Sequence, residues 1–279
     1  MLKGLSRAGL GEIGSDERFI ALAAEYGFQT VDIDAKGLID RNGLEGARKL
    51  LADNGVTIGS IGLSVEWRAS EEKFRDGLAK LAEDAAAAAA LGCRNCCTYI
   101  LPATDYKAAH FTVLATRRLR TCAQILGAYG IRLGLEFVGP HHLRTAWANP
   151  FLWTMHETLD WIDAIGEPNV GLLFDAYHWY TNGHTLADIE ALTPDQIVHV
   201  HINDAPNVAV EDVLDNGRIY PGEGVIDLAG FLKALNAIGY RGSVTQEILS
   251  KEAPAADAAT LLARSKAGYD KVYQAAGLV

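Results

Sequence analysis

Two histidines and an aspartate lie at the end of an apolar stretch, residues 197–204 (IVHVHIND). Its β-branched residues predict a buried strand. His199 and His201, two residues apart, would point to the same face of that strand. Burying imidazoles beside a carboxylate is costly unless each group is hydrogen-bonded or ligated. One such histidine would be explained by a hydrogen bond in the core, so the case for a functional site depends on how other strands end.

Three further apolar stretches end in an acidic residue. Glu136 lies in GLEFVG, Asp175 in VGLLFDAYH and Glu247 in SVTQEIL. Carboxylates can bind a divalent cation or transfer a proton, and so can an imidazole. Whether these groups act together depends on the fold that positions them.

The chain alternates short β-type runs with longer runs of helical periodicity from end to end. Several helical runs are followed by glycine, which readily adopts the left-handed conformation that closes a helix. Eight strand–helix units without a linker predict an α/β fold, a (β/α)8 TIM barrel in one domain spanning residues 1–279. A doubly wound open sheet is disfavoured because no Gly-x-Gly-x-x-Gly follows the first strand. The predicted strands are 5–10, 30–34, 57–63, 95–100, 131–137, 170–174, 197–202 and 243–248, and the predicted helices are 16–26, 45–54, 71–91, 107–129, 155–165, 186–192, 228–238 and 256–275.

A barrel gathers the carboxyl ends of its strands at one face, where barrel enzymes place their active sites. Glu136, Asp175 and Glu247 would therefore meet there, together with a histidine of residues 197–204. Three carboxylates at close range raise one another's pKa values unless a positive charge lies among them. The set predicts a cage for one divalent metal ion, and ligation by oxygens with one nitrogen suits Mn²⁺, Mg²⁺, Co²⁺ or Zn²⁺.

Other side chains would follow strands at the same face and could contact a substrate. One lies in a glycine- and proline-rich stretch, NGRIYPGEG, that could hold an arginine over the pocket. An aspartate beyond the seventh strand could orient a histidine or support the substrate. A tryptophan after the third strand could form a wall. These candidates for substrate binding are His178, Arg218, Asp204 and Trp67.

A metal ion flanked by carboxylates can bind a carbonyl oxygen and a neighbouring hydroxyl oxygen, which makes the adjacent proton easier to remove. It also stabilises the resulting enediolate. Glu136 and Glu247 could be the catalytic pair, one taking the proton and the other returning it. Such general acid–base catalysis typically contributes about 10²–10⁴-fold to a rate. We expect isomerisation or epimerisation of a polyhydroxy ketone or aldehyde.

The strings GLEFVG, VGLLFDAYH, VHVHINDAP, RIYPGEGVIDL and SVTQEIL resemble the xylose-isomerase-like TIM-barrel superfamily of sugar isomerases and epimerases. Within it, the chain looks most similar to inosose isomerases of inositol catabolism and then to ketose 3-epimerases. The resemblance covers nearly the whole chain. It implies His201, rather than His199, as the histidine ligand beside Glu136, Asp175 and Glu247. It also implies that His178 and Arg218 contact the substrate.

The overall composition limits the partners of the protein. A formal charge of −10 and a pI near 5.3 argue against nucleic acid or an anionic membrane. No apolar run approaches the roughly 20 residues that span a bilayer, and the first residues lack a signal-peptide core, so we expect a cytoplasmic protein. The partner expected is a small polyhydroxy carbonyl compound, and relatives of this kind often form homo-oligomers. Cys93, Cys96 and Cys97 fit a buried strand better than a zinc site, because no second ligand pair follows at the right spacing.

Three alternatives to an isomerase remain open. A metal-dependent lyase or dehydratase would use the same site and expel a leaving group, with His141 or His142 as the acid, although positions on a surface loop are the favoured explanation for these histidines. A DNA-repair endonuclease on the same barrel would need three metal ions and a basic face, which fits the acidic chain poorly. A non-catalytic binding protein would tolerate Glu136→Gln or Glu247→Gln without loss of function.

Overall fold

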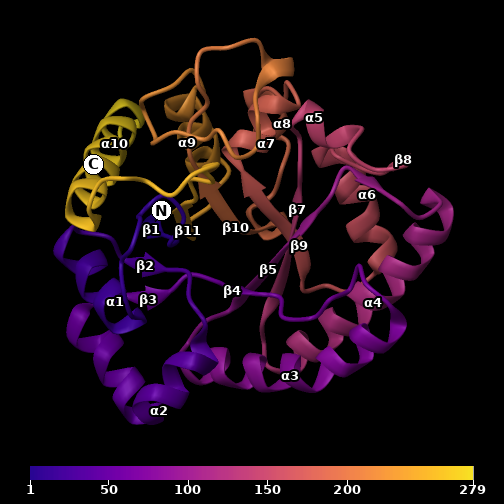
Figure 1. Ribbon diagram of the computed structural model, residues 1–279, viewed down its shortest axis with the longest axis horizontal. Helices are drawn as coiled ribbons and strands as arrows, with labels where there is room; N and C mark the ends of the chain where they lie inside the picture. Colours follow the sequence, from indigo (N-terminus) through magenta and orange to yellow (C-terminus); the bar gives the residue numbers. More distant parts are fainter. Residues whose placement is uncertain (279) are drawn as a thin grey trace.

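Parallel strands form a ring at the centre of the molecule, and helices surround it (Figure 1). The computed structural model describes residues 1–278. The order of the parallel strands is β3-β2-β1-β11-β10-β9-β7-β5-β4. The two outermost strands, β3 (Thr57–Ile58) and β4 (Ile61–Gly62), are halves of one predicted strand, so the chain itself joins the two ends of the sheet. The prediction of a (β/α)8 barrel is therefore confirmed.

The strands of the ring mostly lie where the sequence predicts them. β5 and β10 have the predicted bounds, whereas β1 begins and ends earlier because it pairs with β11 from Leu2 onward and Gly9 turns the chain with a positive φ of 82°. The remaining ring strands are β1 (Leu2–Leu5), β2 (Thr30–Val31), β5 (Asn95–Ile100), β7 (Arg132–Phe137), β9 (Val170–Asp175), β10 (Ile197–Ile202) and β11 (Ser243–Gln246).

The helices that follow the strands cover the outside of the ring. The largest difference from the prediction is α2, which begins ten residues early because Asp34 caps it and a kink at Gly43 lets two helical segments join. Two short helices, α5 and α7, were not predicted. The helices are α1 (Asp16–Glu25), α2 (Ala35–Asn54), α3 (Glu71–Ala90), α4 (Ala108–Ala128), α5 (His141–Arg144), α6 (Met155–Ile165), α7 (Ala176–Thr181), α8 (Leu186–Glu190), α9 (Leu228–Ala237) and α10 (Ala258–Ala276).

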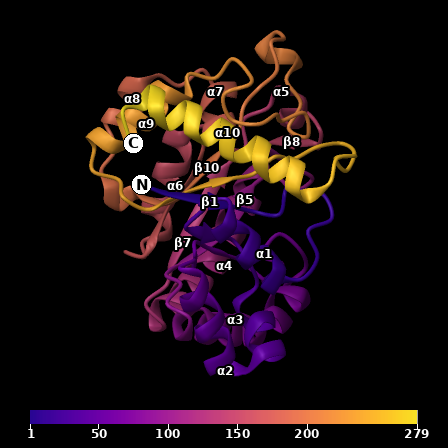
Figure 2. The ribbon, with the colours of Figure 1, turned by 90° about the vertical axis from the view of Figure 1, so that its left-hand side faces the viewer.

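The first and last units of the barrel lie side by side. α10 runs past β1 in both views (Figures 1 and 2). The Tyr269 hydroxyl on α10 lies 2.9 Å from the carbonyl oxygens of both Gly4 and Val244, which ties the last helix to β1 and β11. Elsewhere, β6 (Ala103–Thr104) and β8 (Asn149–Pro150) form a small antiparallel sheet outside the ring. None of the helices in residues 1–278 combines the length and apolar character needed to cross a membrane.

The barrel interior beside β1 contains hydroxyl groups packed tightly against a glycine. A Cβ added to Gly4 would collide with the hydroxyl oxygens of Thr30, Ser243 and Thr245. We expect Gly4→Ala to destabilise the protein by about 1–3 kcal/mol, the usual cost of overpacking a core. Gly62→Ala on β4 is the matched control, because an added Cβ there meets no atom within 4 Å. Urea unfolding measures both; equal midpoints for the two variants would contradict this account.

Candidate metal centre

Four of the predicted site residues meet at the carboxyl ends of neighbouring strands. Glu136 lies in β7, Asp175 ends β9, His201 lies in β10, and Glu247 directly follows β11. Each offers one potential ligand atom, and these four atoms all lie within 4.8 Å of one another. From His201 Nδ1, the nearest carboxylate oxygens are 3.4 Å away on Glu247, 3.5 Å on Glu136 and 3.8 Å on Asp175.

Strand register explains why these side chains meet. His201 pairs with Asp175 on one side and with Thr245 on the other, and Glu136 pairs with Leu173. The pairing therefore places Asp175 beside His201, Glu136 beside the residue two positions before Asp175, and Glu247 two positions beyond the partner of His201, so neighbouring strands bring the four groups together at their carboxyl ends. A shift of one residue in any of these strands would turn its side chain to the opposite face.

The cluster contains polar atoms that the protein itself leaves unpaired. Glu136 Oε1 and His201 Nδ1 are buried and have no hydrogen-bond partner among residues 1–278. Leaving such atoms unpaired in the interior is costly. Both face the centre of a three-carboxylate, one-imidazole set, the donor set that suits a divalent cation. The residues present therefore fit a metal ion.

Arg218 is the positively charged partner of this cluster. Its guanidinium Nη1 lies 2.8 Å from Asp175 Oδ2 and 2.8 Å from Glu247 Oε2, while Nη2 donates to Asp215 Oδ1 at 2.8 Å. It is buried, with 4% of its surface exposed. The predicted loop thus delivers its arginine to the site.

His178 lies between Arg218 and Glu136. It belongs to α7, which begins where β9 ends, because the Asp175 carboxylate accepts the Tyr177 N–H at 2.6 Å and caps the helix. His178 Nδ1 accepts the Gly139 N–H at 3.2 Å. Its Nε2 lies 3.3 Å from Arg218 Nη2 and 3.9 Å from Glu136 Oε1.

The two glutamates differ in electrostatic environment. Burial raises the pKa of Glu136 above the ordinary glutamate value. Burial alone would also raise the pKa of Glu247, but the positive charges of His201 and Arg218 lower it to about 2. Two carboxylates whose pKa values are pushed in opposite directions are the pattern expected of a group that holds a proton and a group that accepts one.

Asp204 and Trp67, which were predicted to contact a substrate, lie outside the cluster of four potential ligands. Both oxygens of the Asp204 carboxylate accept backbone N–H groups, from Ala205, Gly222, Gly224 and Ile226, at 2.9–3.0 Å. Asp204 therefore anchors the loop that carries Arg218. Trp67 is 1% exposed and donates its Nε1–H to Thr98, so it supports the wall of the site from behind. His141 and His142 lie in α5, which contributes no buried residue.

The sequence reasoning missed Asp32, which follows β2. Its carboxylate lies 2.8 Å from His199 Nε2 and 3.7 Å from His201 Nε2. The available signal was another apolar stretch that ends in an acid, VDID at residues 31–34. Asp32 belongs to the wall of a cavity of about 210 Å³ at the cluster. The residues lining this cavity are Ser6, Asp32, Ser60, Ile61, Gly62, Cys97, Thr98, Tyr99, Glu136, Leu173, His201 and Glu247.

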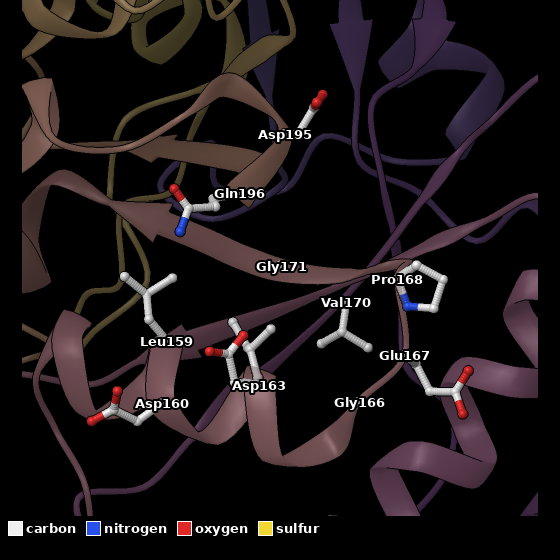
Figure 3. A pocket seen from close by; sticks show the side chains of 11 residues that line it. Leu159, Asp160, Asp163, Gly166, Glu167, Pro168, Val170, Gly171, Asp195 and Gln196 are labelled. Carbon is white, nitrogen blue, oxygen red and sulfur yellow. The ribbon is translucent and has the colours of Figure 1, made fainter.

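A larger cavity, of about 500 Å³, lies at the opposite end of the barrel (Figure 3). Its wall is formed by α6 and by the residues that precede β9 and β10, including Asp163, Glu167 and Asp195. In barrel proteins this amino-terminal end serves stability, and catalysis takes place at the other. The cluster at the carboxyl ends is therefore the candidate site.

His156, His184 and Asp188 form another group of potential metal ligands, but one of its nitrogen atoms is not free to bind a metal. His184 Nδ1 and His156 Nε2 each lie 3.9 Å from Asp188. However, His184 Nε2 already accepts the Met155 N–H at 3.2 Å. A neutral imidazole has one lone pair, so His184 Nδ1 then carries a proton and is not a ligand.

The fold and the cluster together define a TIM barrel with a candidate metal centre at the carboxyl ends of its strands. The family model described as the xylose isomerase-like TIM barrel matches residues 20–266, and the chain belongs to this family. A solved xylose isomerase domain protein from Alicyclobacillus acidocaldarius superposes with a TM-score of 0.92, at 33% identity over 99% of both chains.

Curated relatives include an inosose isomerase from Bacillus velezensis, 31% identical over 48% of this chain and 45% of its own length. A 3-dehydroshikimate dehydratase from Pseudomonas aeruginosa is 32% identical over 47% of this chain and 20% of its own length. An L-ribulose 3-epimerase from Methylomonas sp. is 30% identical over 50% of this chain and 42% of its own length. The chain thus spans less than half the length of each of these relatives.

The charge on His201 leads to a prediction about metal binding. Burial alone would lower the pKa of His201, but Glu247, Asp32 and Glu136 raise it well above the ordinary histidine value. The ring is then protonated at neutral pH, and a metal ion must displace that proton. Binding of Mn²⁺ at pH 7 should release protons, about one of them from His201, and the apparent affinity should increase with pH.

Isothermal titration calorimetry in two buffers of different ionisation enthalpy measures this release. Binding heats that differ in proportion to buffer ionisation support the prediction. Equal heats in both buffers, with Mn²⁺ bound, would show that His201 is neutral before binding.

Proposed function

We propose that the protein is a divalent-metal-dependent isomerase or epimerase of an uncharged polyhydroxy ketone, a keto-sugar or an inosose. The observation that carries this proposal is the cluster of Glu136, Asp175, His201 and Glu247, two of whose potential ligand atoms are buried without a hydrogen-bond partner among the described residues. Membership of the xylose isomerase-like family and the similarity to an inosose isomerase and a ketose epimerase support it. These four residues would hold Mn²⁺, Mg²⁺, Co²⁺ or Zn²⁺.

The bound cation would supply Lewis acidity, which lowers the pKa of a C–H group beside a carbonyl. Glu136 and Glu247 come from different strands and both line the cavity. In our proposal one takes the proton from the substrate carbon and the other returns it. His178 and Arg218 are buried behind the two glutamates and do not line this cavity. In our proposal they contact the substrate oxygens that come closest to Glu136 and Glu247, because His178 Nε2 and the guanidinium lie beside these carboxylates.

The charge of the cavity favours an uncharged substrate. The described residues that line it include Asp32, Glu136 and Glu247 but no lysine or arginine. Arg218 already faces Asp175, Glu247 and Asp215. A bound divalent cation offsets only part of the charge of Asp32, Glu136, Asp175 and Glu247. A phosphorylated or carboxylated substrate would therefore still bring its negative charge towards carboxylates, which is unfavourable in a poorly solvated site.

The second candidate is a metal-dependent dehydratase or lyase, favoured by the similarity to a 3-dehydroshikimate dehydratase. Its named substrate is a carboxylate, so the acidic cavity argues against that compound here. A lyase also needs an acid directed at the leaving group, and neither His141 nor His142 lines the cavity. We therefore place this function second.

NMR in D₂O with a panel of inososes and ketoses tests the proposal. The metal-loaded protein should exchange the hydrogen on the carbon beside the carbonyl for deuterium and form an isomer of unchanged formula. EDTA should abolish the exchange. Loss of water from the substrate would instead identify the dehydratase, and no exchange across the panel with metal bound would contradict proton transfer.

Removing either proton-transferring carboxylate should stop the reaction without unfolding the protein. We expect Glu136→Gln and Glu247→Gln each to lower kcat by about 10²–10⁴-fold, the usual contribution of general acid–base catalysis. Glu25→Gln, at an exposed position on α1, is the control and should keep full activity. Steady-state kinetics with metal binding checked by calorimetry measures the effect. Full activity in either site variant would exclude that residue from the mechanism.

A further inference from the structure

Asp32 is a fixed carboxylate on the far side of His201 from the metal cluster. Its Oδ1 accepts the Ser60 N–H at 3.0 Å, and its Oδ2 lies 2.8 Å from His199 Nε2. The side chain is 14% exposed. Ser60, between β3 and β4, and His199 in β10 therefore hold Asp32 in one orientation.

The two ring nitrogens of His201 face different partners. Nδ1 faces the carboxylates of the cluster, with Glu247 Oε2 at 3.4 Å. Nε2 faces Asp32 Oδ2 at 3.7 Å. A neutral imidazole has one N–H and one lone pair, so a lone pair on Nδ1 requires the proton to be on Nε2. The carboxylate nearest to that proton is Asp32.

We propose that Asp32 is a positioning residue for the metal centre: its carboxylate faces Nε2 of His201 at ion-pair distance, attracts the proton to that nitrogen, and so directs the Nδ1 lone pair into the cluster. A carboxylate that accepts the second N–H of a ligating histidine fixes the tautomer and orientation of the ring, and it makes the ring a stronger donor. This inference rests on the proposed metal centre.

His199 has a matching role on the same strand. Its Nδ1 is buried without a partner among residues 1–278, and its Nε2 donates to Asp32. The rings of His199 and His201 lie edge to face, with centroids 5.4 Å apart. His199 therefore holds Asp32, and Asp32 orients His201. In this proposal the two histidines on one face of β10 differ in function: His201 is a metal ligand, and His199 holds the carboxylate that orients it.

The competing explanation is that Asp32 only satisfies His199 and has no effect on the metal. The isosteric variant Asp32→Asn separates the two, because an amide oxygen is a weaker acceptor than a carboxylate and carries no charge. Asp84→Asn is the matched control. Asp84 is also buried, at 6% exposed, and its carboxylate pairs with Lys80 at 2.6 Å on α3, outside the cluster.

The experiment titrates Mn²⁺, Co²⁺ and Zn²⁺ separately into EDTA-treated wild type, Asp32→Asn and Asp84→Asn. Circular dichroism first establishes that each variant is folded. Asp32→Asn should raise the Kd by about 10–100-fold, the usual effect of losing such a partner. Asp84→Asn should leave the Kd unchanged. The visible spectrum of saturated Co²⁺ protein should also change in Asp32→Asn alone, because the donor strength of His201 differs.

The outcomes distinguish this inference from the function it rests on. Equal Kd values and equal Co²⁺ spectra in all three proteins would overturn the role of Asp32 and leave the metal centre standing. A wild type that binds none of the three ions would overturn the metal centre and the role of Asp32 with it. Metal affinity is measured without substrate, so an inactive substrate panel does not affect the result.

Discussion

The repulsion among three buried carboxylates is the constraint on which the site depends. Glu136 and Asp175 are buried and Glu247 is half-buried, so water screens their charges poorly, and such an arrangement persists only with positive charge nearby. Arg218 supplies a permanent charge to two of the three, and the neighbouring carboxylates raise the pKa of His201, which favours a second positive charge there. Backbone amides of the loop that carries Arg218 donate to the Asp204 carboxylate, and this anchor holds the arginine at the cluster. The charge balance of the cluster therefore accounts for the buried position of Arg218.

The barrel turns this constraint into a defined geometry. Hydrogen-bonded pairing sets Asp175 level with His201, and the helix that starts at Asp175 brings His178 to Glu136 and Arg218. The acids of the cluster come from β7, from β9 and from the residue that follows β11. The cavity beside them also contains Asp32 and the small polar side chains of Ser60 and Thr98.

The barrel could be predicted from the sequence because its signals are local. The apolar run of β10 and the glycine after α6 each define an element without reference to the rest of the chain. β1 was misplaced because its true partner, β11, lies at the other end of the chain, and pairing of that kind leaves no local pattern. The four acidic and histidine residues could be proposed from the sequence because each lies at or near the end of a predicted strand. Asp32 was missed because it lies inside the predicted strand 30–34, whereas the observed β2 ends at Val31. Its importance also comes from histidines 167 and 169 positions away.

Asp175 shows how the start of a helix can prepare a binding site. One oxygen of its carboxylate caps α7 through the Tyr177 N–H, and the other faces Arg218 and His201. The side chain is therefore immobilised by the same hydrogen bond that starts the helix, before any ligand arrives. A glutamate is one methylene longer, so we expect that it could not cap α7 and face Arg218 at the same time. Folding of the chain already orders the Asp175 side chain, so a cation that binds there does not have to order it. This part of the site is therefore preorganised.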